Sequence, residues 1–201
     1  MSDAVSARIF DGVLGAIDLL GMKRWRARTS AAVQGTVLEI GAGGGRNANW
    51  FPPGTLIIAL DPDFELLKIA QKKTGWQGAG VVAIAEALPF KDAAFDCALA
   101  TLVLCSVTDL HKVATELKRT LRPGGSLHAI DHVVSKAPAV RRAQCWLAAP
   151  WYRLTGSCRI ERETLEVLRA EGFRVAVHDT ALRSVLVRYE ALAPVTTDAG
   201  F

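Results

Sequence analysis

Glycines at every second position, Gly41, Gly43 and Gly45, directly follow a short apolar segment at residues 36–40. Glycine has no Cβ, so such a loop brings backbone N–H groups close to a ligand. Asp61 closes the next apolar segment about twenty residues further on, where a carboxylate can accept both hydroxyls of a ribose. The Gly-x-Gly-x-Gly spacing differs from the G-x-G-x-x-G spacing of dinucleotide-binding loops. Together these residues favour an adenosine-containing ligand other than a dinucleotide.

A second set of side chains suited to chemistry follows the apolar segment at residues 126–134. The imidazole of His132 can deprotonate a thiol, an amine or a hydroxyl near neutral pH. The alternative is a histidine that is hydrogen-bonded within the core. The next stretch, residues 135–160, has no clean period and carries three aromatic side chains that predict either an apolar acceptor pocket or a packed lid: Trp146, Trp151 and Tyr152.

The elements that must position these residues alternate along the chain. Short apolar or β-branched segments predict strands at residues 36–40, 56–60, 81–85, 95–99 and 126–134. Asp63 can cap a helix after the second of them. An apolar stripe of helical spacing begins at Leu110, and the proline and glycines at residues 123–125 end that helix. Alternating strands and helices predict an α/β fold with a mostly parallel sheet covered by helices on both faces.

The last third of the chain predicts a different connection. A charged helix is expected at residues 161–171, followed by strands at residues 173–178 and 182–189. The gap between these strands is too short for a crossover helix, so we expect an antiparallel hairpin.

Composition narrows the class of protein. The length of 201 residues fits one domain. Although the mean hydropathy is +0.22, the longest uncharged apolar run, residues 98–107, is well short of the ~20 residues that span a bilayer. Charges interrupt residues 1–20, which argues against a signal peptide. The four cysteines show no CxxC spacing, so we expect reduced thiols, a cytoplasmic protein and no metal site.

Four motifs in order over residues 36–134 resemble the class I S-adenosylmethionine (SAM) dependent methyltransferases: VLEIGAGGG at 37–45, ALDP at 59–62, AEALPF at 85–90, and LRPGG at 121–125. The resemblance implies a Rossmann-like, seven-stranded fold with SAM as cofactor and S-adenosylhomocysteine as product. It implies a cofactor-binding set made of Glu39, Gly41, Ala42, Gly43, Gly45, Asp61, Pro62, Glu86, Ala87, Thr101 and Leu102. In this set the loop holds the methionine end, Asp61 holds the ribose, Glu86 and Ala87 flank adenine, and Thr101 and Leu102 line the sulfonium side.

Later residues are similar to a smaller group that includes membrane-associated alkyl-thiol methyltransferases and bacterial relatives acting on small molecules or phospholipids. The similarity lies in TLVLCSV at 101–107, in Asp131 and His132, and in Pro150-Trp151 with Gly156 and Cys158. It makes His132 and Asp131 the candidate catalytic residues.

The sequence therefore predicts one methyltransferase domain over residues 1–201, with a helical lid at 1–30 and an acceptor-side insertion at 135–160. We expect methyl transfer to a small, fairly apolar acceptor through S, N, O or C, with no nucleic-acid partner. One alternative is a phospholipid or amine N-methyltransferase at a membrane surface, because the apolar spacing before residue 21 and the basic residues 23–28 would suit peripheral membrane contact. Another is a SAM-binding protein that does not methylate.

Overall fold

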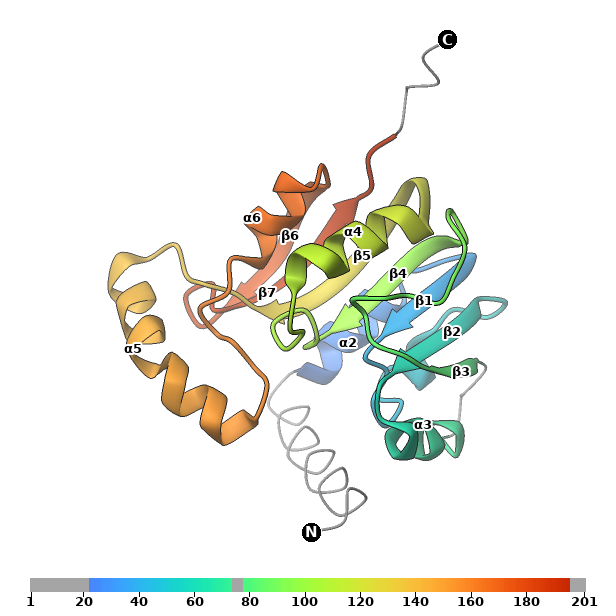
Figure 1. The fold of residues 1–201 in the computed structure, drawn as a ribbon, viewed down its shortest axis with the longest axis horizontal. Helices are drawn as coiled ribbons and strands as arrows, with labels where there is room; N and C mark the ends of the chain where they lie inside the picture. Colours follow the sequence, from blue (N-terminus) through green and yellow to red (C-terminus); the bar gives the residue numbers. More distant parts are fainter. Residues whose placement is uncertain (1–21, 74–77, 196–201) are drawn as a thin grey trace.

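The computed structural model describes residues 22–73 and 78–195 of the 201-residue chain (Figure 1). Its helices are α2 (Lys23–Ser30), α3 (Phe64–Gln71), α4 (Leu110–Thr120), α5 (Pro138–Thr155) and α6 (Thr164–Ala170), with a 3-10 turn, η2 (Ala48–Trp50). Its strands are β1 (Thr36–Ile40), β2 (Leu56–Asp61), β3 (Ala79–Val82), β4 (Phe95–Thr101), β5 (Leu121–His132), β6 (Arg174–Ala181) and β7 (Leu186–Leu192). No helix in these two ranges is long and apolar enough to cross a membrane.

The strands form one seven-stranded sheet in the order β3-β2-β1-β4-β5-β7-β6. Strands β1 to β5 pair in parallel, whereas β7 lies antiparallel to both β5 and β6. The predicted fold, including the antiparallel C-terminal hairpin, is confirmed. The chain order reverses between β1 and β4, and in open α/β sheets ligands bind beyond the carboxyl ends of the strands at such a switch point.

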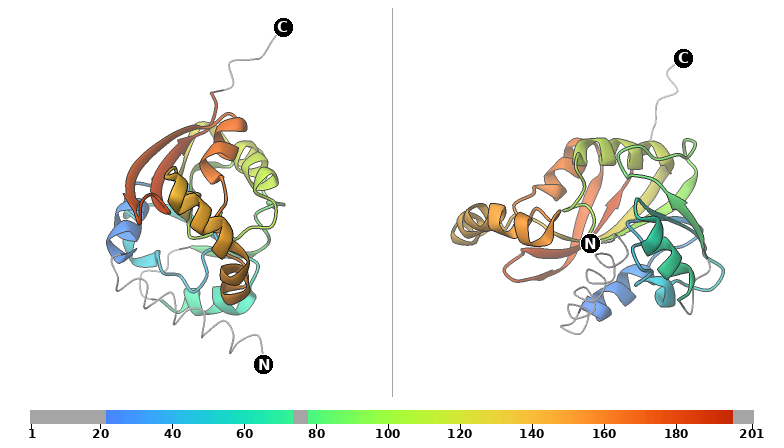
Figure 2. Two further views of the ribbon diagram at one scale, coloured as in Figure 1. Left: turned by 90° about the vertical axis from the view of Figure 1, so that its left-hand side faces the viewer. Right: turned by 60° about the horizontal axis from the view of Figure 1, so that its bottom comes forward.

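Helices cover both faces of the sheet (Figure 2). On one face, α4 and α6 pack against alternate strand residues such as Leu38 and Ile40. On the other, Leu67 of α3 packs with Val37 and neighbouring strand residues, and α2 contacts β4 and β5. Successive strand residues point to opposite faces, which explains why β1 is apolar almost throughout.

Helix boundaries follow local chemistry. Asp63 caps α3 as predicted, since its Oδ1 accepts from the N–H groups of Glu65 and Leu66 at 2.8 and 3.2 Å. The apolar stripe of α4 is buried, but the helix ends at Thr120 and β5 already begins at Leu121, five residues before the predicted start. Pro123 disfavours a helical conformation at the residue before it, so the chain becomes extended ahead of the glycines.

Residues 135–160 are the largest difference from the sequence-based prediction. Instead of an irregular stretch they contain the 18-residue helix α5, which projects from one end of the molecule (Figures 1 and 2). Only Gln144 of this helix is buried, so packing imposes no apolar stripe that periodicity could detect. Pro138 stands in the first turn, where its missing N–H costs nothing, and Gly156 ends the helix in a left-handed conformation.

The predicted lid, residues 1–30, falls mostly outside the described residues. Only its last part, α2, is described, and that helix buries Arg26, Thr29 and Ser30 against the sheet.

Candidate active site

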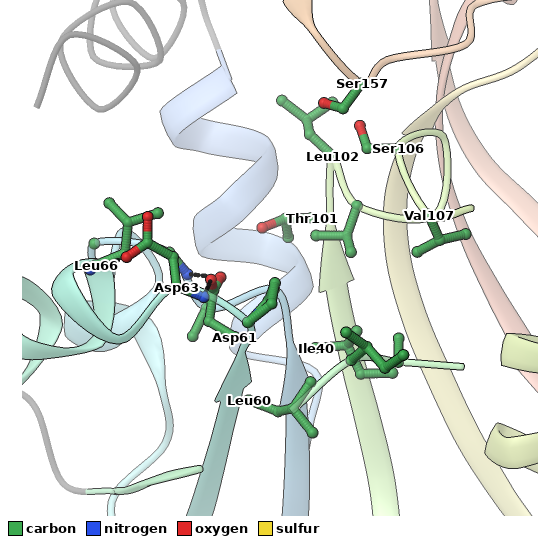
Figure 3. Close-up of a pocket in the computed structure, with 18 of the residues that line it drawn as sticks. Ile40, Leu60, Asp61, Asp63, Leu66, Thr101, Leu102, Ser106, Val107 and Ser157 are labelled. Atoms are coloured by element: carbon green, nitrogen blue, oxygen red, sulfur yellow. Dashed lines mark hydrogen bonds between the residues drawn. The ribbon is translucent and has the colours of Figure 1, made fainter. Parts of the chain in front are cut away.

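A pocket of about 410 Å³ lies at the carboxyl ends of β1, β2 and β4, where the strand order reverses (Figure 3). Eight of the predicted cofactor residues line it: Gly41, Ala42, Gly43, Asp61, Pro62, Glu86, Thr101 and Leu102. The other three, Glu39, Gly45 and Ala87, are not among the lining residues. The fold thus brings residues from three of the four motifs, and from the segment that begins at Thr101, to one cavity.

The glycine loop presents bare backbone to this pocket. Gly43 has φ +51°, a conformation that favours glycine, and a Cβ added to it would meet nothing within 4 Å. The space next to Gly43 is therefore open pocket. Gly45 differs, since an added Cβ would lie 2.9 Å from Cβ of Ala70, and its lack of a side chain lets the loop pack against α3.

Asp61, the last residue of β2, faces the same space and is 7% exposed. Its Oδ2 accepts from the N–H of Gly43 at 2.8 Å, and its Oδ1 accepts from the N–H of Asp63 at 2.9 Å. Burial raises the pKa of this carboxyl, while the two N–H donors act in the opposite direction. Each carboxylate oxygen can accept a further hydrogen bond, so Asp61 can bind two hydroxyl groups while holding the loop.

Behind the pocket lies a buried polar network that the sequence did not reveal. Nδ2 of Asn47 donates to Oε1 of Glu39 at 2.8 Å and to Oγ1 of Thr101 at 3.0 Å. The guanidinium of Arg26, on α2, donates to the same Thr101 oxygen at 2.6 Å. Burial raises the pKa of Glu39 to about 7, even though Asn47 and Arg26 favour its charged form. Asn47 belongs to no motif, and for Arg26 the basic residues 23–28 suggested only membrane contact, whereas its side chain is 3% exposed and lies in this network.

The Glu86 carboxylate is already engaged by backbone. Its Oε1 accepts from the N–H groups of Thr108 and Asp109 at 2.7 and 3.3 Å, which ties the segment after β3 to the start of α4. Ile84 beside it lines the pocket and is 52% exposed, so this end offers an apolar surface suited to a flat ring.

The opposite end of the pocket lies beyond β4. Leu102 adopts φ +60°, rare for a residue with a branched side chain, and its N–H donates to the carbonyl of Ile130 at 2.6 Å. Backbone strain of this kind is held by its surroundings and is frequent at functional sites. Leu102, Ser106 and Ser157 lie together here (Figure 3).

The predicted acceptor-side aromatics lie outside the pocket lining. Trp146 is 82% exposed and Tyr152 41% exposed, both on α5. Trp151 is half-buried and packs against Cys105, Cys158 and Ile160.

The two predicted catalytic residues are also outside the lining and differ in setting. Asp131 is fully buried; its carboxylate accepts from the hydroxyl of Tyr189 at 3.0 Å and from the N–H of Cys105 at 3.2 Å. Burial raises the pKa of Asp131 to about 7, and the same carboxylate ties the loop that carries Cys105 to β5. His132 is partly exposed, and its ring lies 6.4 Å from that of Trp151.

The fold also collects three ligand-type side chains that are far apart in the sequence. Sγ of Cys158 lies 3.7 Å from Sγ of Cys105 and 3.5 Å from Nδ1 of His132. The Cys105 thiol and the His132 ring lower the pKa of Cys158. The expectation of no metal site rested on spacing along the chain, which could not show this cluster.

Comparison with known proteins agrees with this architecture. The family profile of a methyltransferase domain, Methyltransf_11, matches residues 38–129. The thiol S-methyltransferase TMT1A of Homo sapiens is 31% identical over 145 residues, which cover 69% of this chain and 59% of the human protein. The demethylmenaquinone methyltransferase of Thermobifida fusca (strain YX) is 34% identical over 164 residues, covering 72% of this chain and 70% of that protein.

A solved complex between the Haloferax volcanii Trm112 methyltransferase activator and a methyltransferase contains a chain that matches with a TM-score of 0.73 at 18% identity, covering 95% of this chain and 97% of the other. The fold, the ordered motifs and these relatives define a class I SAM-dependent methyltransferase, and the chain belongs to that family. SAM is the cofactor of the family. The open cradle at Gly43 and the hydroxyl-accepting carboxylate of Asp61 fit it.

Proposed function

We propose that this protein transfers the methyl group of SAM to a small, fairly apolar acceptor. The observation that carries the proposal is the pocket in which the bare backbone of Gly43 and the carboxylate of Asp61 stand at one end and the apolar residue Leu102 at the other. SAM supplies an electrophilic methyl group on a sulfonium. The protein's part is to hold the cofactor and acceptor in line, exclude water and accept the acceptor's proton where one must leave.

The cofactor-binding residues that line the pocket or support it have these roles in the proposal. Asp61 binds the ribose hydroxyls, and the bare backbone of the glycine loop surrounds the methionine end together with the Glu39 network. Glu39 itself is 1% exposed and reaches the cofactor through Asn47 and Thr101. Ile84 and the backbone held by Glu86 flank the adenine.

The names of two relatives and the side chains near Leu102 narrow the class of acceptor. One relative is named as a thiol S-methyltransferase and another as a demethylmenaquinone methyltransferase, so a thiol and a quinol ring carbon are the leading candidates. The region beyond Leu102 is compatible with the thiol, because the imidazole of His132 in the neighbouring Cys105–His132–Cys158 cluster can accept a thiol proton near neutral pH.

The test is a screen of alkyl thiols, quinols, phenols and amines with purified protein and SAM. Formation of S-adenosylhomocysteine in step with one methylated product supports the proposal and identifies the atom. Tight SAM binding without turnover on any acceptor would favour the non-methylating alternative. That the fold occurs with another activity is shown by a structural neighbour with a TM-score of 0.67, which is named as the [4+2]-cyclase SpnF.

A second proposal, peripheral membrane contact, rests on α5. Trp146 and Leu154 are 82% and 81% exposed, and with Leu147 they fall within one arc of the helix. The helix carries three arginines and no acid: Arg141, Arg142 and Arg153. A projecting apolar face bordered by arginines suits an anionic lipid surface, where an apolar acceptor would be dissolved.

Co-sedimentation with vesicles tests this second proposal. Binding should be stronger to vesicles containing phosphatidylserine than to pure phosphatidylcholine, and the double substitution of Trp146 and Leu154 to Glu should abolish it. Equal sedimentation of wild type and variant would refute a role for α5.

We also propose a cytoplasmic location, in keeping with four free thiols.

A further inference from the structure

Cys105, His132 and Cys158 reach one point from three separate segments. Cys105 lies in the loop after β4, His132 is the last residue of β5, and Cys158 follows α5. Their Sγ and Nδ1 atoms all lie within 4.8 Å of one another, with separations of 3.7 Å between the sulfurs and 3.5 and 3.9 Å between sulfur and nitrogen. Both thiols are buried and the histidine is partly exposed.

These separations are close to the distances between neighbouring ligand atoms in a tetrahedral zinc site. Two sulfurs about 2.3 Å from Zn²⁺ stand about 3.8 Å apart at the tetrahedral angle, and a sulfur and an imidazole nitrogen at about 2.3 and 2.05 Å stand about 3.6 Å apart. The observed separations differ from these values by a few tenths of an ångström, so a cation can enter with small side-chain adjustments. Two thiolates and one imidazole are the ligands that a soft divalent cation prefers.

The surroundings hold the two cysteines in place, and His132 is fixed by the pairing of β5 with β7. The N–H of Cys105 donates to the buried Asp131, and the carbonyl of Cys105 accepts from the N–H of Arg159 at 2.9 Å. The N–H of Cys158 donates to Oγ1 of Thr155 at 3.3 Å. Because each cysteine backbone is fixed by its own partner, the cluster is organised before any ion binds.

The cluster also borders the pocket. Ser106, next to Cys105, and Ser157, next to Cys158, both line the cavity and lie together beyond Leu102 (Figure 3). Within residues 22–73 and 78–195, no fourth Cys, His, Asp or Glu joins the group. A site with three protein ligands leaves its fourth position to water or substrate, as catalytic zinc sites do.

We propose that Cys105, Cys158 and His132 bind one Zn²⁺ ion, whose fourth position takes up a thiol acceptor as its thiolate. This inference rests on the proposed methyl transfer for its second half only. The thiol displaces water from the metal and loses its proton to solvent. Its sulfur lone pair then forms the bond to the methyl carbon while the bond from that carbon to the sulfonium breaks, leaving its electron pair on S-adenosylhomocysteine. The neutral thioether is a weak ligand, and water replaces it.

The first experiment measures the metal without any turnover. Protein purified under reducing conditions and freed of metal is titrated with Zn²⁺ in competition with a chromophoric chelator, and with Co²⁺ by absorption. One equivalent should bind, and the Co²⁺ form should show a thiolate-to-metal charge-transfer band with the intense visible bands of tetrahedral geometry.

The variants are Cys105→Ser, Cys158→Ser and His132→Ala, with Cys145→Ser as the matched control because Cys145 is exposed on α5. The three cluster variants should lose the stoichiometric metal, and the control should keep it. If a cluster variant fails to fold, the wild-type titration decides alone: less than one equivalent, or no charge-transfer band, overturns the proposal. A Cys105–Cys158 disulfide that forms in air in the presence of Zn²⁺ would also overturn it in favour of a redox pair.

The second experiment separates the two proposals. Adding an alkyl thiol to the Co²⁺ form should shift the charge-transfer band, because a third sulfur enters the metal's coordination shell. SAM affinity, measured by calorimetry on the same metal-free protein, should be intact. Intact SAM binding and turnover without metal would refute the role of zinc in thiol activation and leave methyl transfer standing. Metal binding without turnover on any acceptor would refute methyl transfer and that role of zinc, and leave the metal site standing.

Discussion

Replacing Asp61 with Asn is the sharpest single perturbation of the cofactor site. The carboxylate holds Gly43 and Asp63 through their N–H groups and is expected to accept two ribose hydroxyls as well. An amide keeps one acceptor oxygen and places an NH₂ group where the other stood, so both a ribose contact and one backbone contact are lost.

The magnitude follows from these bonds. Hydrogen bonds to a charged acceptor contribute about 1.5–3 kcal/mol each. The lost ribose bond and the second one, which loses its charged acceptor, together weaken binding by about 3 kcal/mol at the lower end of this range, which corresponds to a SAM dissociation constant raised on the order of 10²-fold. The orphaned backbone N–H adds a stability cost of about 1–3 kcal/mol in the cofactor-free protein.

Isothermal calorimetry with SAM measures the first effect and thermal unfolding without ligand the second. The matched control is Glu65→Gln, since the partly exposed Glu65 carboxylate is bonded to Nζ of Lys68 at 2.9 and 3.0 Å and lies four residues away from Asp61. A folded Asp61→Asn protein that binds SAM within twofold of wild type would refute the assignment of Asp61 to the ribose.

Three further predictions use other parts of the site. Glu39 keeps its proton in the folded state up to about pH 7, so the folded protein binds more protons than the unfolded chain between about pH 4.5 and 7, and the stability falls as the pH rises through this window by up to about 3 kcal/mol. Urea unfolding at pH 5 and pH 8 should show a larger loss in wild type than in Glu39→Gln, where the remaining loss comes from the buried Asp131, whose pKa is also raised to about 7; parallel profiles contradict it. His132→Ala should lower kcat while SAM affinity stays within a few-fold, and wild-type turnover would return His132 to a packing role. Trp151→Ala should raise the acceptor KM, because the ring packs on Cys105 and Cys158, with SAM affinity nearly unchanged; unchanged kinetics with a large drop in Tm would leave Trp151 as packing alone.

The sequence predicted those elements whose caps, turns and apolar periodicity are determined by neighbouring residues. The strand segments, the cap at Asp63 and the buried stripe of α4 each depend on residues within a few positions, and all are confirmed. The helix expected after the glycine loop is wrong, because only the 3-10 turn η2 lies between that loop and β2. The position of the pocket could also be predicted, because the carboxyl ends of parallel strands meet at one edge of the sheet and Gly43 and Asp61 each follow or end such a strand.

The features that the sequence did not predict are an exposed helix and contacts between residues that are far apart along the chain. Helix α5 buries only Gln144, so no apolar periodicity marks it. Cys105 and Cys158 are 53 residues apart, and only the fold shows that their sulfurs lie 3.7 Å from each other. The pairing of Arg26 with Thr101 across 75 residues is of the same kind. Contacts of this kind leave no periodicity or spacing in the sequence, because the two partners lie in segments that are far apart along the chain.

The most direct test of the account follows the methyl group itself. Purified protein is incubated with SAM carrying an isotopically labelled methyl group and with an alkyl thiol, and the products are analysed by mass spectrometry. The account predicts a labelled methyl thioether formed in equal amount to S-adenosylhomocysteine, and its loss in Asp61→Asn at SAM concentrations that saturate wild type. Label that stays on SAM with every thiol, quinol, phenol and amine, in protein shown by calorimetry to bind SAM, would contradict the central claim of methyl transfer.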